Sequence, residues 1–328
     1  MYMAIIAACA FVLALIFGKY AVPALRALKA GQSIREIGPS WHQTKAGTPT
    51  MGGIIFIAAA ALCVFVGGFF TGAIREGDYT HLLVLGFAVL YGLIGFLDDF
   101  YKVKYKRNLG LTALQKFLLQ LVVAGVFLAL LRENGNLSYD LYIPFVQLSI
   151  EIHPVIYMIF AVLVLVGCVN AVNLTDGVDG LATGVTIPVM VFFAIWAYLW
   201  HQSALSLVPA ALVGALCGFL CYNFHPAKVF MGDTGSLFLG GAVCGLAFAL
   251  DMPLILVLVG LIYLIETLSV ILQVGYFKLT HGKRIFRMTP IHHHFEMGGW
   301  SEVKIFTVFV LITCAMCLLA SYGIFERF

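Results

Sequence analysis

Two adjacent carboxylates, Asp98 and Asp99, end an apolar stretch of the sequence and are the first candidates for chemistry. Neighbouring carboxylates repel each other, and ionised groups are costly near hydrocarbon. A cation relieves both problems, whether it is Mg²⁺, a basic neighbour or a shared proton. If the segment is helical, Lys102 lies four residues after Asp98 and can pair with it. The alternative is a solvated salt bridge at the membrane interface.

A short polar segment, residues 170–180, joins two long apolar runs. Asn173, Asp176 and Asp179 are spaced by three, so a helical turn here would place them on one side. Gly177 allows sharp turning and close approach of the backbone to a ligand. A plain connector would not need oxygen-bearing side chains at this spacing, which favours a binding role.

A glycine- and hydroxyl-rich segment, residues 230–236, opens another apolar run. The free N–H groups and positive dipole end of a helix that starts here would suit a phosphate. Asp233 could hold Mg²⁺, which takes one or two carboxylates together with waters and substrate phosphates. The alternative is ordinary capping of the helix by Asp233 or Thr234.

Three consecutive histidines, His292, His293 and His294, lie in the last polar connection. Successive side chains on a helix point about 100° apart, so one zinc ion would not easily take all three. Contact with phosphate, or proton transfer by imidazole, is the favoured interpretation. A structural zinc site is the alternative.

Other polar groups accompany these motifs. Lys45 precedes a glycine- and hydroxyl-rich turn with Thr50, which suits an anion. Lys116 is either a phosphate contact or a snorkelling anchor. Glu266 is costly in lipid and should face the bundle interior, where it could form a buried polar pair with Gln273. Together, the motifs indicate a metal-bound diphosphate handled at the lipid boundary.

Membrane helices must position these groups. Of 328 residues, 62% are apolar and 11% are charged, against about 45–50% and about 25% in soluble proteins. This composition excludes an ordinary soluble enzyme, and the net charge of +3 gives no indication of nucleic acid binding. Since each span needs about 20 apolar residues, we predict an all-α polytopic membrane protein, one domain over residues 1–328, with about ten transmembrane helices. The apolar runs lie near 3–25, 51–72, 80–98, 111–131, 154–174, 178–200, 204–223, 235–250, 252–275 and 302–325.

The distribution of Lys and Arg predicts the orientation. With both termini outside, sixteen of the 19 Lys and Arg residues fall on the cytoplasmic side, where such residues are favoured. Residues 132–153 then lie outside, and their apolar–polar alternation around Pro144 predicts a small extracytoplasmic β-hairpin. The polar motifs fall on the opposite side, in a cytoplasmic active-site cleft.

Five ordered motifs closely resemble the phospho-N-acetylmuramoyl-pentapeptide-transferase family, among the polyprenyl-phosphate N-acetylhexosamine-1-phosphate transferases. They are GTPTMGG (47–53), GFLDDFYK (95–102), NAVNLTDGVDGLA (170–182), FMGDTGSLFLGG (230–241) and TPIHHHFEMGGW (289–300). The resemblance covers essentially the whole chain. It implies transfer of phospho-N-acetylmuramoyl-pentapeptide from UDP to undecaprenyl phosphate, giving lipid I and UMP. This is the first membrane step of peptidoglycan synthesis, in the bacterial inner membrane.

The resemblance also implies Mg²⁺, a homodimer and roles for individual residues. Asp233 is implied as the metal ligand. The implied catalytic set is Asp98, Asp99, Asp233 and His292. The implied substrate-binding residues are Lys45, Thr50, Lys102, Lys116, Asn173, Asp176, Gly177, Asp179, Asn223, Phe230, Gln273, His293 and His294.

Two alternatives remain open from the sequence. A sister transferase would use UDP-N-acetylglucosamine as its donor, although the run PIHHHFE favours the muramoyl branch. An ion-coupled transporter is suggested by Glu266 and the acidic inner face. Transporters, however, bind near the bilayer midplane between broken helices, often with internal repeats, and no repeat is apparent here.

Overall fold

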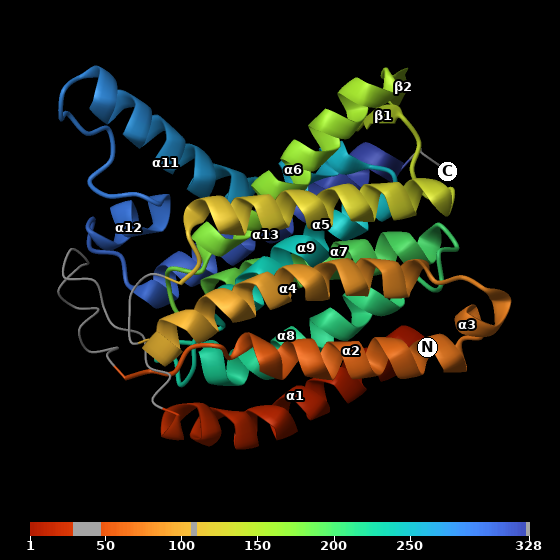
Figure 1. Ribbon diagram of the computed structural model, residues 1–328, viewed down its shortest axis with the longest axis horizontal. Helices are drawn as coiled ribbons and strands as arrows, with labels where there is room; N and C mark the ends of the chain where they lie inside the picture. The colour runs from red at the N-terminus through yellow and green to blue at the C-terminus, as the bar shows by residue number, and fades with distance from the viewer. Residues whose placement is uncertain (29–46, 106–109, 326–328) are drawn as a thin grey trace.

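The protein is a bundle of long helices with one small hairpin, seen in a computed structural model that describes residues 1–28, 47–105 and 110–325 (Figure 1). The elements are α1 (Tyr2–Ala27), α2 (Gly53–Phe70), α3 (Ala73–Glu76), α4 (Thr80–Tyr105), α5 (Ala113–Glu133), β1 (Asp140–Ile143), β2 (Leu148–Glu151), α6 (Pro154–Thr175), α7 (Leu181–Leu199), α8 (Leu207–Asn223), α9 (Gly232–Ala249), the 3₁₀ helix η2 (Pro253–Ile255), α10 (Leu256–Val259), α11 (Leu261–Leu279), α12 (Ile291–Glu296) and α13 (Glu302–Ile324).

Within the described residues, nine helices are long and apolar enough to cross a membrane. The apolar helix α8 is shorter and lies largely buried among them. The predicted all-α polytopic fold is therefore confirmed, and the protein is a multi-pass membrane protein. The helix boundaries follow the apolar runs closely, because only an internally hydrogen-bonded backbone is tolerated in hydrocarbon.

The apolar run near 252–275 was predicted to form one continuous helix, but the structure breaks it. It divides into η2, α10 and α11, with the break at Gly260. A Cβ on Gly260 would lie 2.5 Å from the carbonyl oxygen of Leu256, so the chain turns there more tightly than a side chain allows. In Figure 1, α11 leans away from the rest of the bundle, and α12 returns toward it.

The two chain ends and the hairpin lie at the same end of the bundle (Figure 1). The predicted hairpin is present, with β1 antiparallel to β2. At its turn, Phe145 N–H donates to the carbonyl oxygen of Gly323 at 2.9 Å, which ties the hairpin to the end of α13. α12 lies at the opposite end, where the polar motifs also gather. Because consecutive spans run in opposite directions, the end of α4, the start of α5 and the start of α9 meet there.

Candidate functional site

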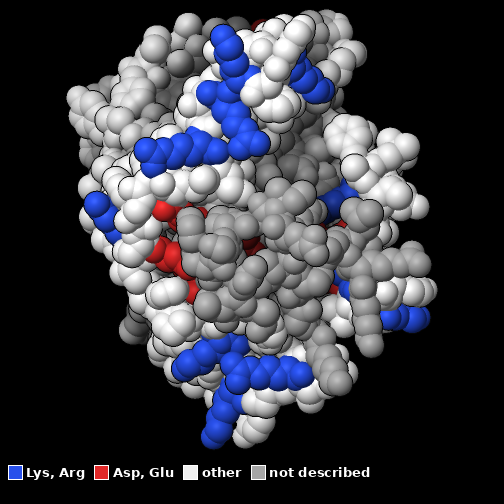
Figure 2. Space-filling model, turned by 90° about the vertical axis from the view of Figure 1, so that its left-hand side faces the viewer, with Lys and Arg blue, Asp and Glu red and all other residues white. Residues whose placement is uncertain are grey.

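Three carboxylates from two helices form an acidic cluster at the α12 end of the bundle. Asp98 and Asp99 lie near the end of α4, and Asp233 lies in the first turn of α9; carboxylate oxygens of all three lie within 4.8 Å of one another. Asp98 and Asp99 are buried, whereas the side chain of Asp233 is 19% exposed. Figure 2 shows this end of the molecule, with acidic side chains near its middle and Lys and Arg above and below them.

Close packing of α4 on α9 brings the cluster together. A Cβ on Gly95 would overlap the carbonyl oxygen of Asp233, so only glycine allows this backbone contact. Gly95 lies one turn before Asp99 on α4, which places the two carboxylates of α4 beside the start of α9. The sequence therefore produces the cluster through a small residue as much as through the acidic ones.

Asp99 caps the start of α9. Its Oδ1 accepts from Asp233 N–H at 3.3 Å, and its Oδ2 accepts from Thr234 N–H at 2.9 Å and from Thr234 Oγ1 at 2.7 Å. These bonds satisfy N–H groups that the first turn of a helix leaves free, and the anion favours the positive end of the helix dipole. The predicted phosphate site on these N–H groups is therefore wrong here, as is the predicted capping by Asp233 or Thr234. Asp99 is a cap supplied by another helix.

Two lysines face the acidic cluster. Lys102 Nζ lies 2.6 Å from Asp98 Oδ2 and 3.0 Å from Asp233 Oδ2, and Lys116 Nζ lies 2.8 Å from the same oxygen of Asp233. The predicted pairing of Asp98 with Lys102 is confirmed. Lys116 turns toward Asp233 instead of anchoring at the lipid surface. Asn173 Nδ2 donates to Asp233 Oδ1 at 2.9 Å, so each oxygen of Asp233 has a partner.

Local capping fixes the position of Lys116. Thr112 Oγ1 accepts from Gln115 N–H at 3.2 Å, and Gln115 Oε1 accepts from Thr112 N–H at 3.0 Å, which together form a capping box at the start of α5. Just before it, Leu111 N–H donates to Asp98 Oδ1 at 2.8 Å. The first turn of α5 is therefore attached to α4, and Lys116 projects from that turn toward the cluster.

This arrangement of charges can hold a divalent cation and bind phosphate. Carboxylate oxygens at such spacing are ligands that Mg²⁺ prefers, and lysine ammonium groups bind phosphate oxygens as point charges. The two lysines balance part of the acidic charge, which limits the cost of keeping these carboxylates close together. The acidic cluster with Lys102 and Lys116 is the candidate active site.

An apolar groove opens beside Lys116. It has a volume of about 530 Å³ and is lined by Ala113, Leu114, Lys116, Phe117, Gln120 and Asn170. Within it, Asn170 Nδ2 donates to Gln120 Oε1 at 2.7 Å, which joins α5 to α6. Among the described residues, Phe117 and Leu114 are exposed. Lys116 therefore belongs both to a charged site and to a groove of apolar character.

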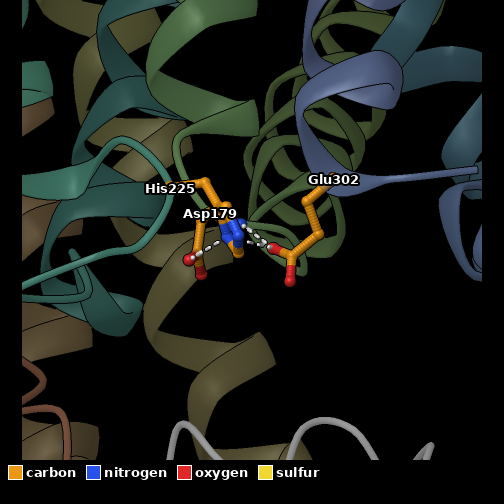
Figure 3. Close-up of side chains that lie close together, drawn as sticks. All are labelled: Asp179, His225 and Glu302. Atoms are coloured by element: carbon orange, nitrogen blue, oxygen red, sulfur yellow. Dashed lines mark hydrogen bonds and ion pairs between the residues drawn. The ribbon is translucent and has the colours of Figure 1, made fainter.

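The turn after α6, residues 176–180, separates Asn173 from Asp179, which the three-residue spacing of this motif had placed together. α6 ends at Thr175, so the helical spacing does not continue to Asp179. Asn173 contacts Asp233, whereas Asp179 is buried and lies 3.0 Å from His225 Nδ1 (Figure 3). The prediction that the two lie on one side is wrong, because the chain turns at the glycines instead of continuing the helix.

Asn223 and Phe230 hold the connection between α8 and α9. Asn223 is buried; its Oδ1 accepts from Thr183 Oγ1 at 2.7 Å, and its Nδ2 donates to the carbonyl oxygen of Val229 at 3.0 Å. Phe230 N–H donates to the carbonyl oxygen of Pro49 at 2.8 Å. The side chain of Asn223 is therefore bonded within the protein, and Phe230 joins this connection to the segment before α2.

Thr50 lies at the acidic cluster. A Cβ on Gly232 would lie 2.5 Å from Asp99 Oδ2 and 2.6 Å from Thr50 Oγ1, so the hydroxyl and the carboxylate flank the same glycine. Gly232 has φ +69°, a conformation that favours glycine. Lys45, predicted beside Thr50, lies outside the described residues.

His292 forms a buried pair with Glu266 of α11. Its Nδ1 lies 3.0 Å from Glu266 Oε2, and both side chains are 0–1% exposed. The carboxylate orients the ring so that Nε2 faces Gly177, where a Cβ would overlap it. The predicted polar pair of Glu266 with Gln273 is wrong: Gln273 Oε1 instead accepts from the N–H groups of Ile285 and Phe286, both at 3.0 Å. Glu266 faces the interior as predicted.

The other two histidines of α12 have separate partners. His293 Nδ1 lies 2.6 Å from Glu296 Oε2, and His294 Nδ1 accepts from Arg287 N–H at 3.1 Å. With His292 on Glu266, the three rings engage three different groups, as their angular spacing on a helix predicts. Both His293 and His294 remain partly exposed, so they are available to a substrate in a way that His292 is not.

Comparison with known proteins identifies the family. A family model described as glycosyl transferase family 4 matches residues 81–251, and phospho-N-acetylmuramoyl-pentapeptide-transferase signature 1 matches residues 45–57. The chain is 46% identical over 314 residues to the phospho-N-acetylmuramoyl-pentapeptide-transferase of Clostridium acetobutylicum, across 94% of this chain and 95% of the other. The chain belongs to the phospho-N-acetylmuramoyl-pentapeptide-transferase family. The resemblance read from the five motifs is thus confirmed.

Other members of this family are equally similar over nearly their whole length. The enzyme of the same name from Caldanaerobacter subterraneus subsp. tengcongensis is 47% identical over 314 residues, covering 96% of each chain. That of Clostridium perfringens (strain 13 / Type A) is 49% identical over 312 residues, covering 94% of this chain and 95% of the other.

Sequence reasoning did not select four residues that the structure places at or beside the site: Gln120, Asn170, His225 and Glu302. Gln120 lies one helical turn after Lys116, and Asn170 opens the third motif, so a signal existed for both. His225 and Glu302 carry no local signal, because their partners lie far away in the sequence.

Proposed function

We propose that this protein transfers phospho-N-acetylmuramoyl-pentapeptide from UDP to undecaprenyl phosphate, giving lipid I and UMP. The observation that carries the proposal is the position of Lys116, whose Nζ lies 2.8 Å from Asp233 Oδ2 and whose side chain lines the apolar groove. An acceptor with an anionic head and a long apolar chain needs both environments at once. Family membership supplies the identity of the donor.

The reaction exchanges one phosphorus–oxygen bond for another. An oxygen of the lipid phosphate attacks the phosphorus nearest the sugar, and the bond from that phosphorus to the departing UMP oxygen breaks. A phosphate monoester loses its second proton near pH 6, so the nucleophile is already ionised at neutral pH and needs no strong base. Positioning and charge stabilisation therefore supply most of the catalysis.

The lysines and Asp98 then have distinct roles. Lys116, at the groove, binds the acceptor phosphate, and Lys102 binds the donor diphosphate. Asp98 holds Lys102 at 2.6 Å and orients the reacting groups. Asp99 touches no substrate; it fixes the start of α9 and so the direction of Asp233.

The acidic cluster also fits Mg²⁺. Asp233 and Asp98 would hold the ion through their Oδ2 atoms, which face the lysine ammonium groups, whereas the oxygens of Asp99 accept from the backbone N–H groups of Asp233 and Thr234. Bound Mg²⁺ would neutralise charge on the diphosphate and on the departing UMP.

The donor occupies the neighbouring turns. We assign its nucleotide to the donor turn, defined as residues 176–180, together with Asn173 and Phe230. His293 and His294 on α12 face its sugar and phosphates. His292 supports the donor turn through Gly177 and acts as a positioning residue. We also assign Lys45 and Thr50 as donor contacts. Asp179, Asn223 and Gln273 act instead as positioning residues, through the backbone that they hold.

We further propose that the site faces the cytoplasm and that the chain forms a homodimer. The termini and the hairpin lie at the opposite end, as the Lys and Arg distribution predicts for an outer face. Labelling of the Gln147→Cys variant, but not of the wild type, by an impermeant maleimide in intact cells would support the orientation. The mass of the purified protein by light scattering tests the dimer.

The decisive test is transfer of labelled phospho-muramoyl-pentapeptide to undecaprenyl phosphate by purified protein, with and without Mg²⁺. UDP-N-acetylglucosamine serves as a parallel donor. Mg²⁺-dependent product from the muramoyl donor alone is the expected result. Product only from the other sugar would move the protein to the sister branch, and no product from either would favour the transporter alternative.

A further inference from the structure

Three side chains from different segments meet beside the donor turn (Figure 3). Asp179 lies in the donor turn, His225 lies in the connection between α8 and α9, and Glu302 is the first residue of α13. His225 Nδ1 lies 3.0 Å from Asp179 Oδ2 and 3.7 Å from Glu302 Oε2. We refer to these three residues as the clasp.

Backbone N–H groups complete the clasp. Asp179 N–H donates to Glu302 Oε2 at 3.1 Å, and Ala227 N–H donates to Asp179 Oδ2 at 3.0 Å. The side chain of Asp179 is 2% exposed and that of Glu302 is 11% exposed, so water competes weakly for these bonds. Because the two oxygens nearest His225 are already bonded to backbone, the clasp is better suited to joining segments than to binding an ion.

The clasp connects the two segments that carry the donor contacts. Glu302, at the start of α13, accepts a hydrogen bond from the backbone of the donor turn. The side chain of Asp179 in turn accepts from Ala227 N–H, in the connection that leads to Phe230 and Asp233. The donor turn is also contacted by His292 at Gly177. Loss of the Glu302 bond would free one side of the turn without touching the acidic cluster.

We propose that Glu302 is a positioning residue for donor binding. It fixes the backbone of Asp179, and through it the donor turn, in the arrangement that receives the nucleotide of the UDP-linked substrate. The inference rests on the proposed function. It differs from the family motifs, because Glu302 lies outside all five of them and acts on a turn more than a hundred residues earlier in the chain.

Steady-state kinetics of E302A and E302Q test the proposal. E302A should raise KM for the UDP donor about tenfold, the effect of losing a hydrogen bond to a charged group, while kcat and the KM for undecaprenyl phosphate change less than about twofold. E302Q keeps an oxygen acceptor and should stay within about threefold of wild type. Since both variants remove the same negative charge from the start of α13, their difference isolates the hydrogen bond. E151A, on β2 at the opposite end, is the matched control.

Two results would overturn the proposal. One is an unchanged donor KM in E302A. The other is that E302A and E302Q show the same fall in kcat and the same rise in both KM values, together with a lower thermal midpoint. That outcome indicates a purely structural role. If E302A does not fold, H225A provides the same comparison from an exposed position, with a smaller expected rise in donor KM.

Amide hydrogen exchange separates this proposal from the proposed function. Residues 177–181 and 225–230 should exchange faster in E302A than in wild type or E302Q, whether or not the wild type makes lipid product. If exchange is faster in E302A but the wild type makes no lipid product, the role of Glu302 in holding the donor turn is retained and the transferase proposal is refuted. If the wild type makes lipid product but E302A changes neither the exchange rates nor the donor KM, only the proposed positioning role of Glu302 is refuted.

Discussion

Asp233 and Glu266 are both carboxylates in an apolar protein, but their surroundings are opposite. Asp233 is partly exposed and faces two lysines and an asparagine. A substrate or an ion can take the place of these partners. Glu266 is fully buried and holds one histidine. The contrast shows that residue type alone does not identify a catalytic acid. Accessibility and exchangeable partners do, and the predictions for Asp233 and for His292 test the two sides of this contrast.

The largest effect is expected from Asp233→Asn. The change removes the charge shared by Lys102 and Lys116 and the proposed Mg²⁺ ligand, so turnover should fall by about 10²–10³-fold and Mg²⁺ dependence should weaken. Lipid product formation at several Mg²⁺ concentrations measures both. The thermal midpoint should stay near the wild-type value. Near wild-type turnover would remove Asp233 from the metal site.

Lys116→Met should lower kcat/KM for undecaprenyl phosphate by about 10²-fold, because it removes a charge-assisted contact to the acceptor phosphate. The matched control is Lys104→Met on α4, where the ammonium lies over the rings of Phe100 and Tyr105 instead of facing the cluster. If both variants lose activity equally, general surface charge, and not the position of Lys116, governs lipid binding.

His292→Ala and His293→Ala should differ in kind. The first removes the imidazole that pairs with the buried Glu266 and leaves only the backbone N–H of residue 292 on this carboxylate. It should lower the free energy of unfolding by about 3 kcal/mol, seen as a lower thermal midpoint in detergent. The second should reduce turnover and leave the thermal midpoint unchanged, since His293 is partly exposed. A large loss of stability in His293→Ala would instead revive the structural zinc alternative.

The smallest effect is expected from Phe117→Ala in the groove. Removing part of its apolar surface should raise KM for undecaprenyl phosphate about fivefold, which is roughly 1 kcal/mol of lost apolar contact, with the donor KM unchanged. Phe69→Ala removes an equally exposed aromatic ring from α2 and should have no effect on either KM. An equal response to both changes would argue against a lipid path along α5.

The sequence predicted those features that depend on neighbours along the chain. Apolar runs indicated the spans, since a membrane helix must be apolar over its whole length. The spacing of Asp98 and Lys102 predicted their ion pair. The break at Gly260 was not predicted, because the residues on both sides remain apolar and only the close approach to Leu256 reveals the bend.

Contacts between distant segments could not be predicted from spacing. Asp99 caps α9 from a helix more than a hundred residues earlier, and Glu302 reaches back to Asp179 over a similar separation. Helical spacing gave a wrong prediction at the end of α6. It grouped Asn173 with Asp179, although the helix ends at Thr175 between them. The residue types of the candidate site could therefore be predicted, whereas the partner of each side chain depended on packing.

The cap that Asp99 supplies also constrains motion. Asp99 of α4 accepts three hydrogen bonds from the start of α9, and the two helices touch backbone to backbone at Gly95, so neither helix can slide past the other without breaking those bonds. We therefore expect the two helices to move together. The start of α5 is joined to the same unit, through Leu111 N–H on Asp98 and Lys116 on Asp233. We therefore expect adjustment to substrates to fall to α12, which carries the histidines.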